Sequence, residues 1–186
     1  MLSVIASCYI ADAQKKAHFD SVLDLSYSFS TNDNKYNSLG LGYTAGVQLL
    51  NDWLFLGGGA KVGYDKYEFP LLSGKYFQGT MYLDARLYIP VKKLTSLYVD
   101  YKLGVSGADP KISSETSSEI TTYKNLILGG PFKSLGFGIR IPSEDGKDVG
   151  LGFSFDYNEL TLKKNREPIL GAGAVENLAF KLEYYF

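Results

Sequence analysis

The amino-acid sequence predicts an all-β protein, an eight-stranded antiparallel up-and-down transmembrane β-barrel with short periplasmic turns and longer extracellular loops. Three observations carry this prediction. Apolar and polar side chains alternate with a period of two in eight separate runs. The connections between the runs alternate between short and long. The apolar side chains of the runs are too bulky to fill the inside of eight strands.

The composition of the 186-residue chain agrees with many strands and tight turns. It includes 15 Tyr, 11 Phe and 20 Gly, residues that suit strands, turns and the aromatic belts of membrane proteins. No run reaches the length of about 20 apolar residues that a spanning helix needs, so any membrane crossing is made by strands. The net charge of −1 lacks the basic surplus of a nucleic-acid-binding surface, and no nucleic-acid partner is expected.

The first residues are expected to be a signal peptide that lacks the usual basic start, which leaves truncation and the true start codon open. A short apolar segment, residues 1–10, precedes Ala11-Asp12-Ala13, an A-x-A cleavage site. Cleavage after Ala13 makes residues 1–13 the leader and residues 14–186 one barrel domain. Residues 5–8 also resemble a lipoprotein box, so lipidation of Cys8 and an uncleaved segment are the alternatives.

The first four strands follow from apolar residues at every second position. Residues 23–30 alternate Leu and aromatic residues with Asp and Ser, and residues 39–49 alternate apolar residues with Gly, Thr and Gln. After a short turn at Asn51-Asp52, residues 53–65 continue the pattern, with glycines that leave room for facing side chains. Residues 81–89 form the fourth run, and Pro90 is expected to close it because proline cannot donate to a strand ladder.

The last four strands show the same alternation with different clarity. Residues 97–106 alternate regularly, as do residues 149–158 and 177–186. The sixth run is clear only over residues 134–141, because Gly129-Gly130-Pro131 interrupts its beginning and predicts a bulge or bend there. Residues 169–175 are expected to extend the last strand.

The connections predict which end of the barrel carries the loops. The short ones fall at residues 51–52, 91–96 and 142–147, and the longer, more polar ones at 31–37, 66–77, 107–123 and 159–174. Outer-membrane barrels have this asymmetry, with both chain termini on the periplasmic side. The third long connection contains Ser113 to Glu119, a polar stretch that we expect to be a solvated loop.

The volume of the side chains decides which face points inward. About 40 bulky apolar side chains cannot fit inside eight strands, so we expect them to face lipid and the small or charged residues to line the lumen. Six acids and five bases make this predicted lumenal charge network nearly neutral. Its members are Asp24, Lys61, Asp65, Asp84, Arg86, Asp100, Lys102, Arg140, Asp156, Lys181 and Glu183. The Asp84/Arg86 and Asp100/Lys102 pairs lie on neighbouring strands and are expected to form one cluster that plugs the lumen.

The last strand carries the most specific pattern, an alternation that ends in Phe186. Its apolar positions are Leu178, Phe180, Leu182, Tyr184 and Phe186. This pattern resembles the assembly signal of Gram-negative outer-membrane proteins, and residues 14–186 resemble the small OmpA/OmpX-type barrels, with a leader end similar to Bacteroidetes examples. The resemblance implies a monomer in the outer membrane, contact with its lipid and lipopolysaccharide, and recognition by the barrel-assembly machinery. It supplies no activity.

The candidate chemistry is sparse, and the protein is expected not to be an enzyme. Lipid-modifying barrels use a His with a Ser, but His18, the one histidine, precedes the first strand. No metal site or cofactor is expected. Residues 163–166 (Lys-Lys-Asn-Arg) form either a solvated loop tip or a contact for lipopolysaccharide phosphates. A structural or surface-interaction role with a largely closed lumen is the prediction. The alternatives are a narrow, porin-like passive channel for ions or small solutes and a soluble lipocalin-like barrel that binds an apolar ligand.

Overall fold

Eight strands of the computed structural model close into an antiparallel barrel, and two more form a separate hairpin. The structure describes residues 17–31, 35–69, 72–92, 95–108, 112–116, 119–123, 126–143, 147–164 and 167–186. The barrel strands are β1 (His18–Ser30), β2 (Lys35–Leu49), β3 (Leu54–Phe69), β4 (Leu72–Lys92), β5 (Thr95–Ala108), β8 (Leu126–Ile141), β9 (Val149–Lys164) and β10 (Glu167–Tyr185). The hairpin joins β6 (Ile112–Thr116) to β7 (Glu119–Tyr123).

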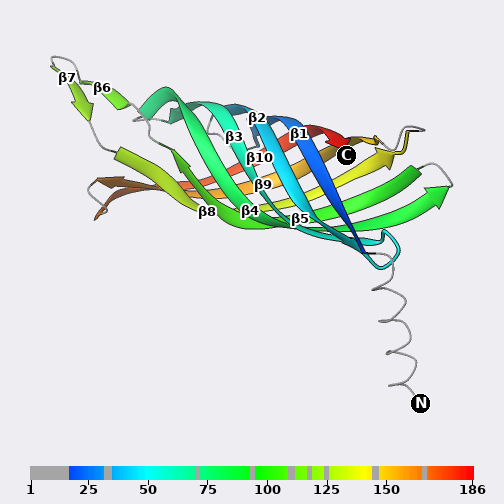
Figure 1. Ribbon diagram of the computed structural model, residues 1–186. Coiled ribbons are helices and arrows are strands. Elements are labelled where there is room, and N and C mark those ends of the chain that lie inside the picture. Colours follow the sequence, from blue (N-terminus) through cyan, green and yellow to red (C-terminus); the bar gives the residue numbers. More distant parts are fainter. Residues whose placement is uncertain are drawn as a thin grey trace.

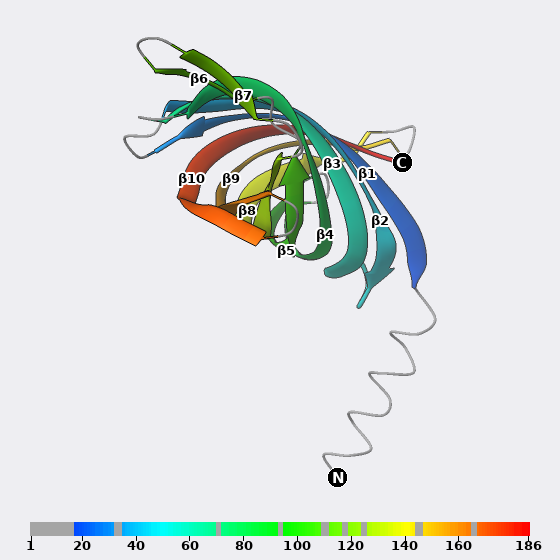
Figure 2. The ribbon, with the colours of Figure 1, turned by 90° about the vertical axis from the view of Figure 1, so that its left-hand side faces the viewer.

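The strands follow one another around the barrel in sequence order, and β10 closes the ring against β1. Their pairing runs from Val22 opposite Tyr185 to Ser30 opposite Asn177. Figure 2 shows the strands wrapped around a common interior. Every barrel strand therefore has a hydrogen-bonded neighbour on both sides, and the predicted eight-stranded up-and-down topology is confirmed.

The two ends of the barrel differ. Because neighbouring strands are antiparallel, β1 begins and β10 ends at the same end as the β2–β3, β4–β5 and β8–β9 turns. We call this the terminal end and the opposite one the loop end. The β6–β7 hairpin stands at the loop end, away from the C-terminus (Figure 1). A paired hairpin thus replaces part of the solvated loop that the polar sequence around Ser113 predicts.

At the loop end the strands continue well beyond the predicted runs. Strands β3 and β4 stay paired as far as Phe69 opposite Leu72, and β9 and β10 as far as Lys164 opposite Glu167. Residues 169–175 extend β10 as predicted, with irregular pairing between Pro168 and Ala174. Much of the predicted long connections is therefore paired strand, because backbone hydrogen bonds tolerate the polar side chains found there.

Two predictions made at prolines, a bulge in β8 and the end of β4, are wrong. Strand β8 keeps one register with β5 from Leu128 to Arg140, so Gly129-Gly130-Pro131 contains no bulge. The interval from Gly129 to Phe132 is matched residue for residue by Asn158 to Thr161 in β9, so neither strand gains a residue. Strand β4 does not end at Pro90 but continues to Lys92, with a register shift between the two. The proline ring fixes φ at a value that an extended strand can accommodate.

The predicted turn at Asn51-Asp52 is built from left-handed backbone conformations. Leu50, Asn51 and Asp52 have φ angles of 53°, 56° and 70°, which Asn and Asp adopt more readily than other non-glycine residues. The Gln48 side-chain amide donates a hydrogen bond of 2.8 Å to the Asp52 carbonyl and holds the turn against β2. The tight connection sets the β2–β3 register from the terminal end.

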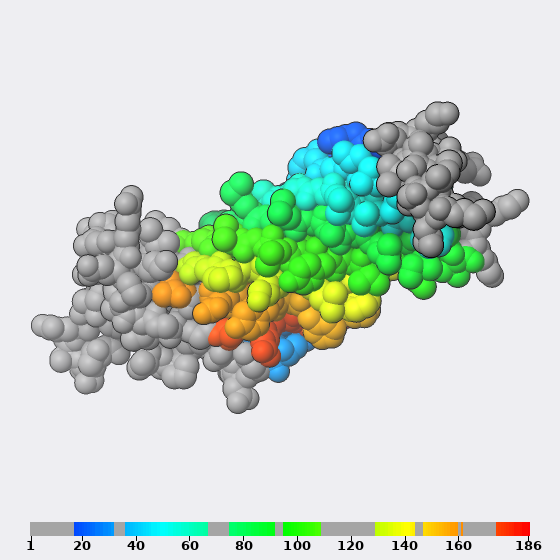
Figure 3. Space-filling model, turned by 90° about the horizontal axis from the view of Figure 1, so that it is seen from below, coloured from blue at the N-terminus to red at the C-terminus, as the bar shows by residue number. Residues whose placement is uncertain are grey.

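The barrel has its apolar side chains on the outside and its charges on the inside. Large apolar side chains are exposed on all eight barrel strands, up to 71% for Leu83 and 69% for Met81. Figure 3 shows one side of this outer surface, where successive strands run side by side. The buried side chains are mostly polar or charged, the reverse of a soluble protein core. Among the described residues, no helix has the length and apolar character needed to span a membrane.

Candidate functional site

The lumen is crossed by an ion-paired network centred on Arg86 of β4. The Arg86 guanidinium donates to Asp84 Oδ2 through Nε (2.9 Å) and Nη2 (2.8 Å), and through Nη1 to Glu183 Oε1 (3.0 Å) and the Tyr185 hydroxyl (3.2 Å). The side chains of Arg86, Asp84 and Glu183 have no exposed surface. Glu183 and Tyr185 lie on β10. Three strands separate β10 from β4 in either direction around the barrel, namely β9, β8 and β5 in one direction and β1, β2 and β3 in the other. The network therefore spans the barrel.

A second set of charges on β5 and β10 joins this network. Lys181 Nζ donates to both carboxylate oxygens of Asp100 at 3.0 Å. Lys102 Nζ lies 3.8 Å from Asp84 Oδ2 and 3.9 Å from Asp100 Oδ2. The Asp84/Arg86 and Asp100/Lys102 pairs thus meet in one cluster. Lys181 and Glu183 attach it to the opposite strand, a partnership that spacing along the sequence does not indicate.

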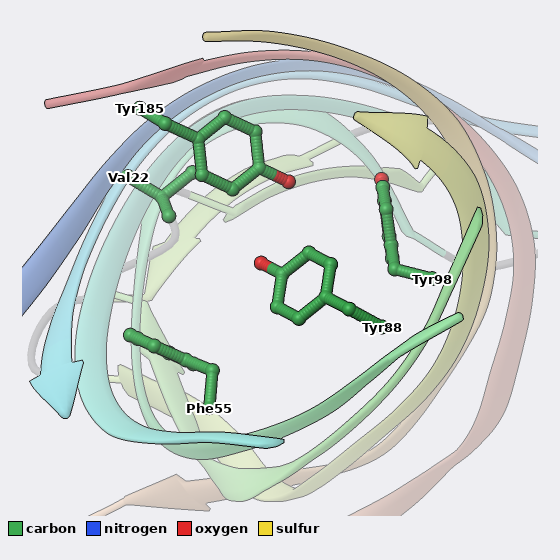
Figure 4. Close-up of a cluster of buried hydrophobic side chains, with 5 residues drawn as sticks. All are labelled: Val22, Phe55, Tyr88, Tyr98 and Tyr185. Atoms are coloured by element: carbon green, nitrogen blue, oxygen red, sulfur yellow. The ribbon is translucent and has the colours of Figure 1, made fainter. Parts of the chain in front are cut away.

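A group of buried side chains packs beside the Arg86 network. Figure 4 shows these residues pointing into the lumen from β1, β3, β4, β5 and β10. They are Val22, Phe55, Tyr88, Tyr98 and Tyr185. The Arg86 guanidinium carbon lies 5.8 Å from the Phe55 ring centroid and 5.7 Å from that of Tyr98, distances at which an aromatic face attracts a cation. The lumen is therefore filled by aromatic rings as well as by the small and charged residues that the sequence alternation predicted there.

Glycines on β8 and β9 make room for these large side chains. A Cβ atom at Gly138 or Gly152 would overlap the Tyr98 ring or its hydroxyl, and one at Gly136 would overlap Asp100 and Lys181. These glycines lie on the inward register of their strands, opposite the bulky residues of β5 and β10. They supply the volume that eight strands otherwise lack.

Arg140 of β8 forms a separate ion-paired group towards the terminal end. Its Nε donates to Asp148 Oδ2 at 2.7 Å and its Nη1 to Asp20 Oδ2 at 3.1 Å, and its guanidinium carbon lies 4.4 Å from the Tyr185 ring centroid. The sequence analysis missed Asp20 and Asp148, which are both buried. Continuing the alternation by two residues toward the N-terminus, from Val22 in β1 and from Gly150 in β9, would have found them.

Four other members of the predicted lumenal set face inward without joining these two groups. They are Asp24, Lys61, Asp65 and Asp156. Asp156 accepts a hydrogen bond of 2.9 Å from the Ser154 hydroxyl. Lys61, Asp65 and Asp156 line a small cavity of about 20 Å³ nearer the loop end, large enough for about one water molecule. The charged side chains of the inward face are thus densely ion-paired in one part of the lumen and sparsely ion-paired in another.

The terminal end holds a larger cavity of about 210 Å³, lined among others by His18, Asp52, Tyr88 and Arg140. His18 Nδ1 lies 3.5 Å from Asp52 Oδ1, and both side chains are more than half exposed. No group of three His, Cys, Asp or Glu side chains that could hold a metal ion occurs among the described residues. The one histidine therefore lies at the rim of the terminal end, beside a turn.

The remaining predicted positions divide between the outer surface and the part of the chain outside the described residues. Phe180, Leu182, Tyr184 and Phe186 of the last strand face outward and are exposed, whereas Leu178 is half-buried. The Phe186 N–H donates to the Ser21 carbonyl at 3.0 Å, which continues the β1–β10 seam. Ala11, Ala13 and Cys8 lie outside the described residues, and so do the side chains of residues 163–166.

Comparison with known proteins relates the fold to outer-membrane barrels. No family model and no curated protein sequence matches the chain. Among solved structures, Neisserial surface protein A matches with a TM-score of 0.55 and 9% identity, covering 91% of this chain and 94% of its own. A major outer membrane protein from Thermus thermophilus matches at 0.54 and 12%, covering 91% and 100%.

The outer membrane enzyme PagL matches with a TM-score of 0.50 and 10% identity, covering 87% of this chain and 97% of its own. At such low identities these similarities describe the fold and carry no residue role from one protein to another. The chain has the closed eight-stranded antiparallel architecture of these outer-membrane barrels.

Proposed function

We propose that this protein is an integral outer-membrane barrel with a closed lumen and a structural or surface-interaction role. The observation that carries the proposal is the ion pair between Arg86 and Glu183. The pair joins strands on opposite sides of the barrel, and neither side chain has exposed surface. A rigid barrel whose interior is filled by such pairs is suited to holding loop-end hairpins in place. It is poorly suited to passing solutes.

The outer surface supports residence in a membrane. Exposed Leu, Val, Met and aromatic side chains surround the barrel on all eight strands, far more apolar surface than soluble proteins expose in one patch. A soluble lipocalin-like barrel would need an apolar interior for its ligand, whereas Arg86, Asp100 and Lys102 lie inside this one. Closure also leaves the eight barrel strands without a free edge, which favours a monomer.

The orientation follows from the asymmetry of the two ends. Outer-membrane barrels place short turns in the periplasm and longer extensions outside, so the terminal end is proposed to face the periplasm. The apolar positions of β10, including Phe180 and Phe186, are proposed to be read by the barrel-assembly machinery. The outer surface then contacts outer-membrane phospholipid and lipopolysaccharide.

A non-enzymatic role is proposed from the position of His18. Hydrolytic catalysis by a Ser nucleophile needs a neighbouring base within hydrogen-bond reach. His18 lies against Asp52 at the terminal end, so it could not serve a site at the loop end. A narrow passive channel is the second candidate, because the cavities of about 210 and 20 Å³ on either side of the network leave space in the lumen.

Conductance in planar bilayers tests the closed lumen. The refolded protein, checked by its heat-modifiable mobility on a gel, should give no steady openings. Arg86→Ala removes the side chain that spans the lumen and should raise the current if water can enter the gap. Steady, ion-selective openings of the unaltered protein would favour the channel. Recovery of the protein in the soluble fraction without detergent would overturn the membrane assignment.

A further inference from the structure

A buried carboxylate lies in the part of the lumen nearer the loop end. Asp65 of β3 is 1% exposed, and neither its Oδ1 nor its Oδ2 accepts a hydrogen bond from a described residue. Ser38 and Tyr36 are its hydroxyl neighbours, but the Tyr36 hydroxyl donates instead to Gln78 Oε1 at 3.5 Å. Burying an ionised carboxylate without compensation is very costly. Asp65 therefore calls for a counterpart that can approach both of its oxygens.

Asp65 shares a small cavity with other oxygen-bearing side chains. The residues that line this cavity of about 20 Å³ include Asp65, Ser38, Asp156 and Asn177. Asn177 of β10 is 3% exposed, and its Oδ1 likewise accepts no hydrogen bond from a described residue. Asn177 is directly opposite Asp156 of β9, and Asp65 is directly opposite Ser38 of β2. Two cross-strand pairs from different sides of the barrel thus present oxygen atoms to one space.

Glycines keep this space open. Gly63 lines the cavity, and a Cβ atom there would lie 3.0 Å from Asp65 Oδ1 and 3.0 Å from Ser38 Oγ. Gly40 is opposite Gly63 in β2, and the Lys61 side chain passes over it with Nζ 3.2 Å from the Cβ position. The two glycines thus leave room both for a small ligand beside Asp65 and for the long Lys61 side chain.

The three oxygens without partners favour a cation over a proton or a water molecule. A proton on Asp65 would satisfy one of them, and one water molecule can donate to only two. A cation can be coordinated by both Asp65 oxygens, by Asn177 Oδ1 and by the Asp156 carboxylate at once. Among the described residues that line the cavity, two carboxylates face one ammonium group, that of Lys61. Their net charge of −1 attracts a cation as well.

We propose that Asp65, Asp156 and Asn177 bind a calcium ion inside the barrel, near the loop end. Ca²⁺ accepts carboxylate, amide and water oxygens in a flexible geometry, whereas Mg²⁺ demands a nearly ideal octahedron. Flexible coordination suits this site, because its ligands come from three strands and only two of them are acidic. The ion ties β3 to β9 and β10 below the β3–β4 and β9–β10 turns at the loop end. The inference depends on the barrel fold and not on the membrane around it.

Asp24 of β1 provides a matched control. It is 2% exposed, and its Oδ2 accepts no hydrogen bond from a described residue, but it is not among the described residues that line the cavity. Asp24→Asn therefore removes a buried lumenal carboxylate and leaves the proposed ligands intact. Lys61→Met tests the sign of the charge, because loss of a neighbouring positive charge strengthens the binding of a cation.

The test measures binding of Tb³⁺, a luminescent probe for Ca²⁺ sites, to the full chain folded in non-ionic detergent and freed of metal by a chelator. Tyr36 lines the cavity, so tyrosine excitation should sensitise Tb³⁺ bound there, and Ca²⁺ should displace the probe. Asp65→Asn should weaken Ca²⁺ binding about tenfold or more, because affinity follows the number of charged ligands. Asp24→Asn should bind like the unaltered protein, and Lys61→Met should bind Ca²⁺ more tightly. Calorimetric titration with Ca²⁺ alone checks the same order without the probe.

No binding of Ca²⁺ in the millimolar range, where weak extracellular sites bind it, would overturn the proposal. Equal binding by Asp65→Asn, an equal loss in Asp24→Asn, or weaker binding by Lys61→Met would overturn this site. Displacement of Tb³⁺ by Mg²⁺ or Na⁺ as effective as that by Ca²⁺ would overturn calcium as the ion. Heat-modifiable mobility shows that each variant is folded, and Asp156→Asn replaces Asp65→Asn in the comparison if the latter does not fold.

Discussion

Arg86 and Glu183 form an ion pair of 3.0 Å between strands that stand opposite each other in the barrel. Withdrawing two such charges from water is costly, so the pair by itself contributes little net stability. Its partners change that balance, because Asp84 and the Tyr185 hydroxyl accept hydrogen bonds from three more of the five guanidinium N–H groups. Removing one member then leaves the others buried with fewer compensating partners.

Arg86→Met should therefore lower the free energy of unfolding by about 3–5 kcal/mol, because it removes the ion-pair partner of buried Glu183 and leaves buried Asp84 only the more distant Lys102. Urea unfolding of the barrel in detergent, followed by gel mobility, measures the change. Combining it with Glu183→Gln should cost less than the sum of the single changes. Strictly additive losses would contradict a direct contact between the two side chains.

Gly138→Ala should destabilise the barrel by about 1–3 kcal/mol, the usual cost of overpacking. The added Cβ atom would overlap the Tyr98 ring and the Leu151 carbonyl. Gly107→Ala is the matched control, because nothing lies within 4 Å of its Cβ position. Both variants can be compared by thermal loss of the folded gel band. A Gly138→Ala barrel as stable as the Gly107→Ala barrel would mean that Tyr98 does not occupy this space.

Trp53, the one tryptophan, should report insertion into a bilayer. It lies at the β2–β3 turn at the terminal end and is 49% exposed, a position suited to the membrane interface. Its emission should shift to the blue in liposomes, and quenchers near the headgroups should act more strongly than quenchers at the acyl-chain ends. Trp53→Phe should abolish the signal. An emission spectrum unchanged by liposomes would contradict burial of this end in lipid.

Phe186→Ala should lower the amount of folded protein in the outer membrane several-fold in cells while refolding in detergent stays nearly unchanged. The physical reason is that the Phe186 side chain is 54% exposed on the outer face, so little packing is lost. Its proposed role is recognition during assembly. Phe19→Ala, which removes another exposed aromatic ring at the terminal end, serves as the control. Equal losses in the two variants would argue against a specific signal.

The alternation of side chains was sufficient to predict the strands and their two faces. Strand β1 illustrates this, since Leu23, Leu25 and Tyr27 are exposed and Asp24 and Ser26 are buried, as the period of two requires. Strand ends were harder to predict. Lys66 to Phe69, Lys163 and Lys164 remain paired because backbone hydrogen bonding continues where the side-chain pattern fades.

The candidate site was predicted as a set of inward charges rather than as contacts. Arg86 could be assigned to the lumen from its place in β4. Its contacts with Glu183 and Tyr185, 97 and 99 residues further on, depend on barrel closure. The same holds for Arg140 and Asp20, which are separated by 120 residues. Local spacing contains no information on such pairs, because strand number and stagger place them together.

By itself, the sequence determined an all-β chain with one bulky apolar face and one small, charged face, since strand geometry places alternate side chains on opposite sides. Only the tertiary structure decided which charges meet, because closing β10 onto β1 brings Glu183 across the lumen to Arg86. It also decided that aromatic rings fill the space left by Gly138 and Gly152, since volume inside a barrel is shared by strands distant in sequence.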